Sequence, residues 1–411
     1  MVNNKDLGYN RNMFSKNKIL SLVFLLIFLA AGISCTSVPE EEKQNEQNEL
    51  TASDSKIEQQ LKKMTLREKV GQLFIIRPES LDPSYSLDRV HFSSKTGSTK
   101  IKEEMKLSYE DYPAGGVILF SRNLISPKQV KEFTSEIHNL SEIPVLVCID
   151  EEGGTVARLA NNSAFHLPKL KNMYYIGKNQ DSEQAYDAGN IIGEYLAEYG
   201  FDVDFAPIAD VNTNPKNPVI GPRAFSADPE VAGEMVVSFS KGLTENGVIP
   251  CMKHFPGHGD TKTDTHSGYA ETLKTWNQLL NCEMIPFEKG IEADIPFIMT
   301  AHITVPNVEK ERIPSTLSSI ILTDKLRKEL GFEGIIITDA MEMGAIQHSY
   351  EPDEAVIMAI NAGVDIILIP YDYKKCFDAV MDAVEEGTLS IERIDESVRR
   401  ILSIKNKYKN L

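Results

Sequence analysis

Eight short apolar runs, each bounded by turn-forming residues, recur along the chain and mark its predicted core. Their hydrophobicity is continuous rather than alternating, as strands that are buried on both faces require. Segments with helical spacing separate most of the runs; one begins with Asp228 and Pro229, a cap and a first-turn proline, and ends at Gly247. The runs cover residues 70–76, 115–120, 144–150, 203–210, 248–253, 296–303, 334–340 and 365–370.

Strands that alternate with helices in this way predict an α/β protein. Eight strand–helix units within residues 57–411 match a single (β/α)8 TIM-type barrel with insertions. A doubly wound parallel sheet is the structural alternative, because periodicity cannot show whether a sheet closes. The barrel is favoured because the strand count is eight and no second-domain boundary is visible.

Residues 1–34 have the features of an export signal. An uncharged apolar run over residues 19–31 leads into Gly-Ile-Ser-Cys, and it is preceded by basic residues at Lys5, Arg11, Lys16 and Lys18. The run is shorter than the roughly 20 apolar residues that a spanning helix needs. Cys35 follows small residues, which resembles a bacterial lipoprotein box, although Gly32 stands where that box usually has Leu. We expect a lipoprotein signal peptide with lipid on Cys35; a plain signal peptide or an uncleaved anchor is the alternative.

The tract that follows the signal is strongly polar. Residues 35–56 include EEEKQNEQNE and contain no aromatic residue, so they cannot bury enough apolar surface to order themselves. We expect a flexible acidic tether, which would place an exported, monomeric catalytic body on a lipid anchor in the cell membrane.

The overall charge excludes one class of partner. Sixty acidic and 43 basic residues give a formal charge of −17, and such a surface repels phosphate backbones, so we expect no nucleic-acid binding. The cysteines besides Cys35 form no C-x-x-C pair, so neither a zinc ribbon nor a redox motif is predicted. No cofactor is indicated.

Polar side chains stand where several predicted strands end. In a barrel of parallel strands, chemistry gathers on the loops after these ends. A single aspartate in such a place often only caps the following turn, but a set on one rim predicts an active site. The residues are Asp150, Asp210, Lys253 with His254, His302 and Asp339.

The richest segment is KHFPGHGDTKTDTH, residues 253–266. A polar surface loop is one interpretation, and a zinc site made of His254, His258 and His266 is a second. The third is an acid/base loop, because Asp264 stands two residues before His266 and can accept a hydrogen bond from its Nδ1–H. Nε2 of His266 would then be free to give or take a proton.

This segment resembles the long signature of the β-N-acetylhexosaminidase branch of family 3 glycoside hydrolases. Further segments resemble the family in the family's order: residues 64–74, 113–124, 150–159, 205–225 and 337–343. The resemblance implies a retaining exo-hydrolase that removes a terminal β-linked sugar at a barrel active site.

The resemblance also implies roles for particular residues. Asp339 matches the nucleophile that forms the covalent glycosyl-enzyme, and His266, held by Asp264, matches the acid/base. Contacts to the terminal N-acetylglucosamine would come from Asp150, Arg158, Arg223, Lys253 and His254. A salt-bridge role beneath the rim is the plainer alternative for Arg158 and Arg223.

The chain departs from the family pattern in two places. Residues 150–155 are Asp-Glu-Glu-Gly-Gly-Thr where the family commonly shows D-Q-E-G-G-R; the extra negative charge of Glu151 and the loss of the arginine at Thr155 put supporting contacts there in doubt. Residues 77–112 form a long polar insertion, which we expect on the catalytic rim, shaping the subsite for the leaving sugar. We expect His302 to support the site and His258 to bond within its loop.

The function predicted from the sequence is therefore an exo-β-N-acetylglucosaminidase that acts on peptidoglycan fragments or other GlcNAc-terminated saccharides. Family 3 β-glucosidases and xylosidases take a carboxylic acid/base from a second domain, which we expect this chain to lack. A β-N-acetylglucosaminide phosphorylase, a non-catalytic sugar-binding lipoprotein and a zinc hydrolase are the alternatives.

Overall fold

The computed structural model of this protein describes residues 55–92, 96–262 and 270–409. The predicted signal peptide, Cys35 and nearly all of the predicted tether lie outside these residues, as do Asp264 and His266. One compact unit spans Ser53–Leu411. Within the described ranges, no helix is both long enough and apolar enough to cross a membrane.

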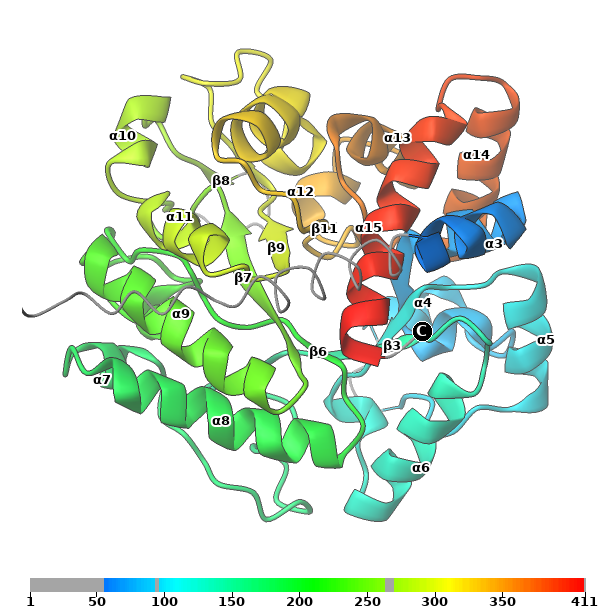
Figure 1. Cartoon of the computed structure of the whole chain (residues 1–411), viewed down its shortest axis with the longest axis horizontal. Coiled ribbons are helices and arrows are strands. Elements are labelled where there is room, and N and C mark those ends of the chain that lie inside the picture. Colours follow the sequence, from blue (N-terminus) through cyan, green and yellow to red (C-terminus); the bar gives the residue numbers. More distant parts are fainter. Residues whose placement is uncertain (1–54, 93–95, 263–269, 410–411) are drawn as a thin grey trace, which may run out of the picture. The chain divides into compact units, whose positions relative to one another are not determined.

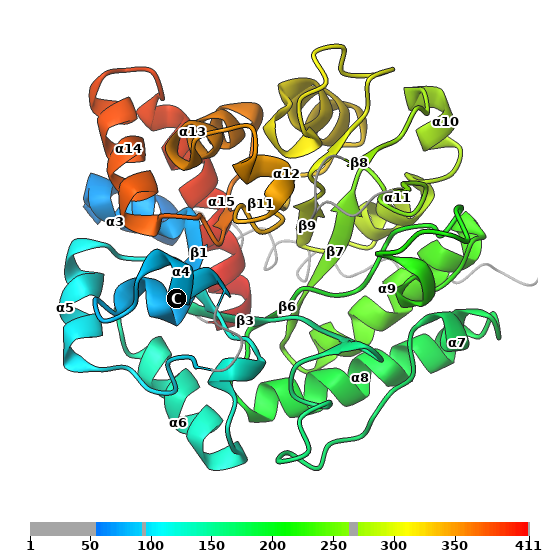
Figure 2. The same ribbon diagram turned by 180° about the vertical axis from the view of Figure 1, so that it is seen from behind.

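Eight parallel strands form the centre of this unit (Figures 1 and 2), which confirms the strand count predicted from the sequence. Their spatial order is β11-β9-β7-β6-β3-β2-β1-β12. A parallel bridge between Ile337 and Ile366 links the two ends of this order, so the sheet is a nearly closed barrel. The strands are β1 (Phe74–Ile76), β2 (Gly116–Ile118), β3 (Leu146–Ile149), β6 (Val203–Asp204), β7 (Ile249–Phe255), β9 (Phe297–Thr300), β11 (Ile335–Thr338) and β12 (Ile367–Leu368).

Most predicted strands are shorter in the structure, and two of these differences have a clear local cause. The run at 70–76 begins as helix, because Thr65 and Glu68 form a capping box that starts α3 (Leu66–Gln72). The run at 203–210 keeps only β6 as a strand, because Pro207 has no N–H to donate to a ladder. Pairing resumes as a single bridge between Ile208 and Lys253.

Helices surround the strands (Figures 1 and 2). Helix α9 (Pro229–Glu245) begins at the predicted cap, where the Asp228 side chain accepts hydrogen bonds from Glu230 N and Val231 N. The others include α4 (Leu87–Phe92), α5 (Glu103–Asp111), α6 (Pro127–His138), α7 (Tyr174–Gly177), α8 (Ser182–Glu198), α10 (Trp276–Leu280), α11 (Ile285–Glu292), α12 (Gly344–Gln347), α13 (Pro352–Ala362), α14 (Tyr373–Glu385), α15 (Ile391–Lys409) and the π-helix η5 (Ile320–Glu329).

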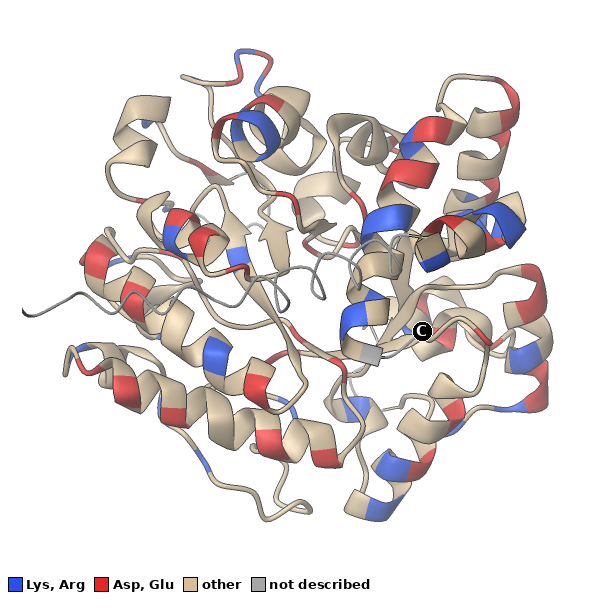
Figure 3. Ribbon diagram, viewed as in Figure 1, with Lys and Arg blue, Asp and Glu red and all other residues tan. Residues whose placement is uncertain are grey.

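Asp and Glu stand together with Lys and Arg on these outer helices and on the loops between them (Figure 3). Helix α8 carries four carboxylates and no Lys or Arg, and its buried face is made of Ala, Gly, Ile, Leu and Tyr. The four described cysteines, Cys148, Cys251, Cys282 and Cys376, are free thiols. Helix α8 therefore adds four negative charges to the outside of the barrel, and the charged cluster described next has a different balance.

Candidate active site

One cavity opens at the carboxyl ends of the barrel strands. Its volume is about 920 Å³, and its lining includes Asp150, which directly follows β3, and Asp339, which directly follows β11. Parallel strands bring their carboxyl ends to one rim, so residues nearly 190 positions apart share a pocket. The other predicted sugar-binding residues also line it: Arg158, Arg223, Lys253 and His254.

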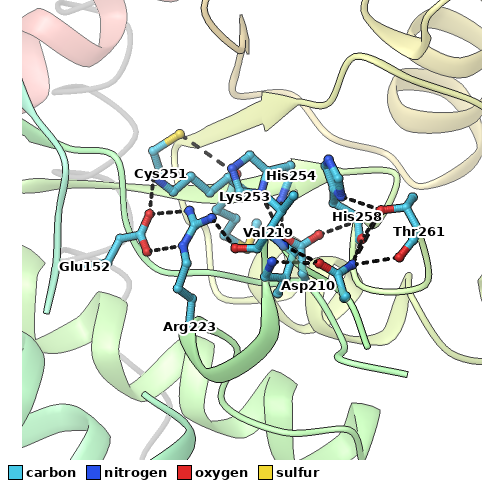
Figure 4. Close-up of polar contacts among 12 residues, drawn as sticks. Glu152, Asp210, Val219, Arg223, Cys251, Lys253, His254, His258 and Thr261 are labelled. Carbon is cyan, nitrogen blue, oxygen red and sulfur yellow. Dashed lines mark hydrogen bonds and ion pairs between the residues drawn. The ribbon is translucent and has the colours of Figure 1, made fainter. Parts of the chain in front are cut away.

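Five charged side chains form a connected cluster in this pocket. Lys253 Nζ lies 2.9 Å from Asp150 Oδ1 and 2.7 Å from Glu152 Oε1. Arg223 binds both carboxylate oxygens of Glu152: its Nε donates to Oε2 at 2.8 Å and its Nη2 donates to Oε1 at 2.7 Å (Figure 4). Arg158 Nη2 donates to Asp150 Oδ2 at 3.2 Å. Three cations meet two carboxylates here, in contrast to the acidic surface.

The cluster is built to stay ionised. Burial by itself would raise the pKa of Glu152, but the charges of Arg223 and Lys253 outweigh it and lower the pKa to about 2. The charges of Lys253 and Arg158 likewise overcome burial and hold the pKa of Asp150 well below its ordinary value. The same carboxylates raise the pKa of Lys253 against the effect of burial. The pocket therefore presents fixed charges over a wide pH range.

A small hairpin after β3 places Glu152 and Arg158. Strands β4 (Glu151–Gly153) and β5 (Val156–Ala157) pair antiparallel, and the turn between them holds Gly154 at φ +61°. A Cβ on Gly154 would lie 2.1 Å from Asn172 Oδ1, so glycine is required by both conformation and space. The local sequence thus turns the chain so that residues on both sides of the hairpin enter the pocket.

The departure from the family pattern at 151–155 is explained by this hairpin. Glu151 is buried, and its carboxylate accepts from Leu159 N and Ala160 N at 2.9 Å and from the Tyr195 hydroxyl at 2.9 Å. Burial is the main cause that raises its pKa. Thr155 donates through its backbone N to Asn172 Oδ1 at 2.8 Å. The additional carboxylate therefore braces the hairpin, while Glu152 holds the cations, a role that the sequence alone did not assign.

A second polar network holds the first part of the histidine-containing segment 253–266. The Asp210 carboxylate lies 2.7 Å from His254 Nδ1 and accepts from His258 N at 2.6 Å. His258 Nδ1 is 2.7 Å from Thr261 Oγ1, as expected for a residue that bonds within its loop (Figure 4). Asn217 donates to the carbonyl of His258 at 2.8 Å. These hydrogen bonds fix the segment from His254 to Thr261.

Asp339 is half-buried and held in place by backbone groups. Its Oδ1 accepts from Ala340 N at 2.7 Å, and its own N donates to Thr300 O at 3.1 Å. His302 Nε2 lies 3.0 Å from Ala340 O, and its Nδ1 lies 2.8 Å from Thr316 Oγ1. His302 therefore supports the loop that carries Asp339, in agreement with the sequence prediction.

The first part of the predicted insertion reaches the same cavity. Arg77, His91 and Phe92 line it, so the two ends of the 77–92 segment lie on the rim as expected. Helix α5, the later part of the insertion, is absent from the lining and packs against the 3₁₀ turn at Pro78–Leu81. Arg77 and His91 both bind the carboxylate of Glu342. Burial opposes ionisation of Glu342, but the hydrogen bond from His91 and the charge of Arg77 lower its pKa. No pattern in the sequence predicted this contact.

The predicted acid/base pair, Asp264 and His266, lies outside the described residues, and with it one member of the alternative zinc site, His266. The lipidation candidate Cys35 lies outside them as well. In the described part of the chain, no group of three or more His, Cys, Asp or Glu side chains is placed to hold a metal ion. The roles of these residues stay predictions.

Fold and pocket together define the class of protein. A parallel barrel with carboxylates, arginines and a lysine converging at its carboxyl rim is the arrangement of a barrel enzyme that holds a small polar substrate. The family follows from the sequence match: residues 65–404 fit the glycosyl hydrolase family 3 N-terminal domain, and the chain belongs to that family of glycoside hydrolases.

Individual relatives agree with this assignment. Beta-hexosaminidase A of Pseudoalteromonas piscicida is 33% identical over 338 residues, which cover 76% of this chain and 56% of that protein. The beta-hexosaminidase of Hydrogenovibrio crunogenus is 33% identical over 302 residues, covering 72% of this chain and 83% of that one. A solved family 3 beta-N-acetylglucosaminidase from Paenibacillus sp. str. FPU-7 has a TM-score of 0.76 at 35% identity and covers 84% of this chain. The chain spans 63% of that structure, so it matches only part of some relatives.

Proposed function

We propose that this protein is a retaining exo-β-N-acetylglucosaminidase. The observation that carries the proposal is the meeting of Asp339 with the ionised cluster around Lys253 in one cavity at the barrel rim. Relatives named beta-hexosaminidase and a solved beta-N-acetylglucosaminidase of the same family support this choice of substrate.

In the proposed reaction, Asp339 is the nucleophile. Its carboxylate oxygen attacks the anomeric carbon while the bond from that carbon to the leaving oxygen breaks, and His266 gives its proton to the leaving oxygen. In the second step, His266 takes a proton from water, the water oxygen bonds to the anomeric carbon, and the carboxylate of Asp339 leaves. Asp264 would hold the tautomer of His266 and stabilise its imidazolium form.

The charged cluster would bind the terminal sugar. Asp150, Arg158, Arg223 and Lys253 offer charged donors and acceptors at fixed positions, which suits hydroxyl groups and an acetamido group. His254, fixed through Nδ1 by Asp210, would present Nε2 to the sugar. Since these carboxylates bind more than one cation each, the cluster would keep its shape when sugar enters.

We further propose that the protein acts outside the cytoplasm. Residues 1–34 would be a lipoprotein signal peptide, Cys35 would carry the lipid, and residues 36–56 would link a monomeric body to the membrane. Peptidoglycan fragments are the substrate that such a location offers. Metabolic labelling with an alkyne fatty acid tests the anchor: label is expected on the wild type, and equal label on Cys35→Ser would contradict the assignment.

The catalytic assignment is tested with p-nitrophenyl β-N-acetylglucosaminide. His266→Ala is expected to lower kcat by about 10²- to 10⁴-fold, the usual contribution of a general acid/base, and Asp339→Asn at least as much. Matched controls are Asp353→Asn and His166→Ala, which change the same residue types outside the pocket lining and are expected to retain activity.

Two product measurements complete the test. Mass spectrometry of protein treated with a 2-fluoro GlcNAc analogue should find the added sugar on Asp339 and not on Asp339→Asn. Product analysis in phosphate buffer should find free GlcNAc; GlcNAc-1-phosphate would show a phosphorylase instead. Wild-type activity in both Asp339→Asn and His266→Ala would overturn the proposal.

A further inference from the structure

The cavity extends beyond the charged cluster. Its volume of about 920 Å³ lies at the upper end of the range of small-molecule sites, and residues with no part in the proposed binding of the terminal sugar line one side of it. That side is formed by His91 and Phe92 from α4, Glu342 from the loop after β11, and Tyr371 from the loop after β12. We call these four residues the α4 wall.

The α4 wall is firmly attached to the loop that carries Asp339. His91 binds the carboxylate of Glu342 through Nδ1 and the carbonyl of Tyr371 through Nε2. Its ring stacks on the ring of Tyr371 with centroids 4.7 Å apart and planes 9° apart. The His91 side chain is only 1% exposed. Glu342 stands three residues after Asp339, so the end of α4 is fixed close to the proposed nucleophile.

The next residue, Phe92, is exposed to solvent, in contrast to the buried side chain of His91. It is 71% exposed, more than any other large apolar side chain in the described part of the chain, and it still lines the cavity. Because Phe92 is both exposed to solvent and part of the cavity lining, its ring is accessible to a ligand that enters the cavity. Phe92 also contacts its fixed neighbour: the ring centroids of Phe92 and His91 lie 6.3 Å apart, and the ring planes meet at 63°.

The charges of the cavity show what kind of group this ring would meet. Each of the four Lys and Arg side chains in the described lining is already paired with a carboxylate: Arg77 with Glu342, Arg158 with Asp150, Arg223 with Glu152, and Lys253 with both Asp150 and Glu152. The α4 wall therefore offers an aromatic face rather than an unpaired cation. Aromatic faces pack against the C–H face of a pyranose ring.

We propose that Phe92 is the stacking platform for the sugar ring on the leaving side of the scissile bond, and so determines the preference for saccharides over small aglycones. This inference rests on the proposed glycosidase function. The ligand chemistry is a β-1,4-linked amino-sugar ring, which either a chitooligosaccharide or a muramyl-containing peptidoglycan fragment supplies.

Kinetics on three substrates test the assignment. Diacetylchitobiose and GlcNAc-β-1,4-anhydro-N-acetylmuramic acid each place a ring on the leaving side, whereas GlcNAc β-fluoride places a single atom there. Phe92→Ala is expected to lower kcat/KM on at least one disaccharide by about 5- to 10-fold, as loss of one aromatic contact predicts, but not on the fluoride. Phe92→Tyr should restore disaccharide cleavage, since its ring face is kept.

A matched control comes from the same insertion. Leu107 on α5 is 57% exposed and absent from the cavity lining, so Leu107→Ala should leave all three substrates unaffected. A loss on both disaccharides supports recognition of the shared ring face, and a loss on one alone supports the assignment and identifies the source. An equal loss on the fluoride, or none on either disaccharide, overturns it. Wild-type protein that hydrolyses none of the three overturns the proposed function as well.

Discussion

A buried lysine at the opposite end of the barrel allows a sharp test of the energetics. Lys405 on α15 is 0% exposed, and its Nζ donates to Gln72 Oε1 at 2.6 Å and to Gly115 O at 2.9 Å. Both acceptors are neutral oxygens near the amino ends of β1 and β2. Because burial penalises the ammonium more than the nearby Cys148 and Asp202 favour it, the pKa of Lys405 falls from 10.5 to about 7.

The shift sets the size and sign of a pH effect. A fall from 10.5 to about 7 corresponds to about 5 kcal/mol of lost stability at pH values below 7, where Lys405 is charged in both the folded and the unfolded protein. Between pH 7 and 10.5 the unfolded chain binds more protons than the folded one. The free energy of unfolding therefore rises with pH, by about 1.4 kcal/mol per unit, and the penalty is gone above 10.5.

Urea unfolding of wild type, Lys405→Met and Lys407→Met measures this effect. The only tryptophan, Trp276, is buried and reports unfolding by fluorescence. Between pH 7 and 9 the wild type should gain about 3 kcal/mol relative to Lys405→Met, while Lys407→Met, on the exposed face of α15, should run parallel to wild type. Parallel curves for wild type and Lys405→Met would refute the reasoning that burial of this ammonium destabilises the fold.

Two further predictions concern the site itself. Glu152→Gln leaves Arg223 and Lys253 short of a carboxylate and should lower the unfolding free energy by about 3–5 kcal/mol at pH 7. In urea titrations this difference should shrink as the pH falls from 4.5 toward about 2, where half of the folded wild-type protein has Glu152 protonated; a pH-independent difference would contradict the charge argument. Gly154→Ala forces a Cβ onto Asn172 Oδ1, whereas Gly387→Ala, also at positive φ, meets open space. Thermal melts should show the larger loss, beyond about 1 kcal/mol, for Gly154→Ala.

The fold was largely predictable because its signal is local. Continuous apolar runs bounded by turn residues mark buried parallel strands, and all eight appear in the order of the chain. Errors fell at boundaries where a single side chain intervenes, such as the capping box of Thr65 and the missing N–H of Pro207. A capping box or a proline can be recognised in a sequence, but the apolar run that contains it predicts a strand over the same residues.

The candidate site was predictable to the extent that it follows from strand ends. Asp150, Lys253 and Asp339 each stand at the end of a strand, so parallel packing alone brings them to one rim. Their partners were not predictable in this way. Glu152 could have been a surface carboxylate, and only the hairpin turn directs it onto Arg223 and Lys253.

The sequence by itself determined the strand count, the class of fold and the position of the chemistry along the chain. The tertiary structure alone decided that His91, 251 residues before Glu342, fixes an exposed Phe92 at the mouth of the cavity, and that Lys405 is buried among neutral oxygens. The physical reason is the range of the interactions. Strand and helix patterns depend on neighbours a few residues apart, whereas ion pairs and burial depend on which distant segments closure of the barrel brings together.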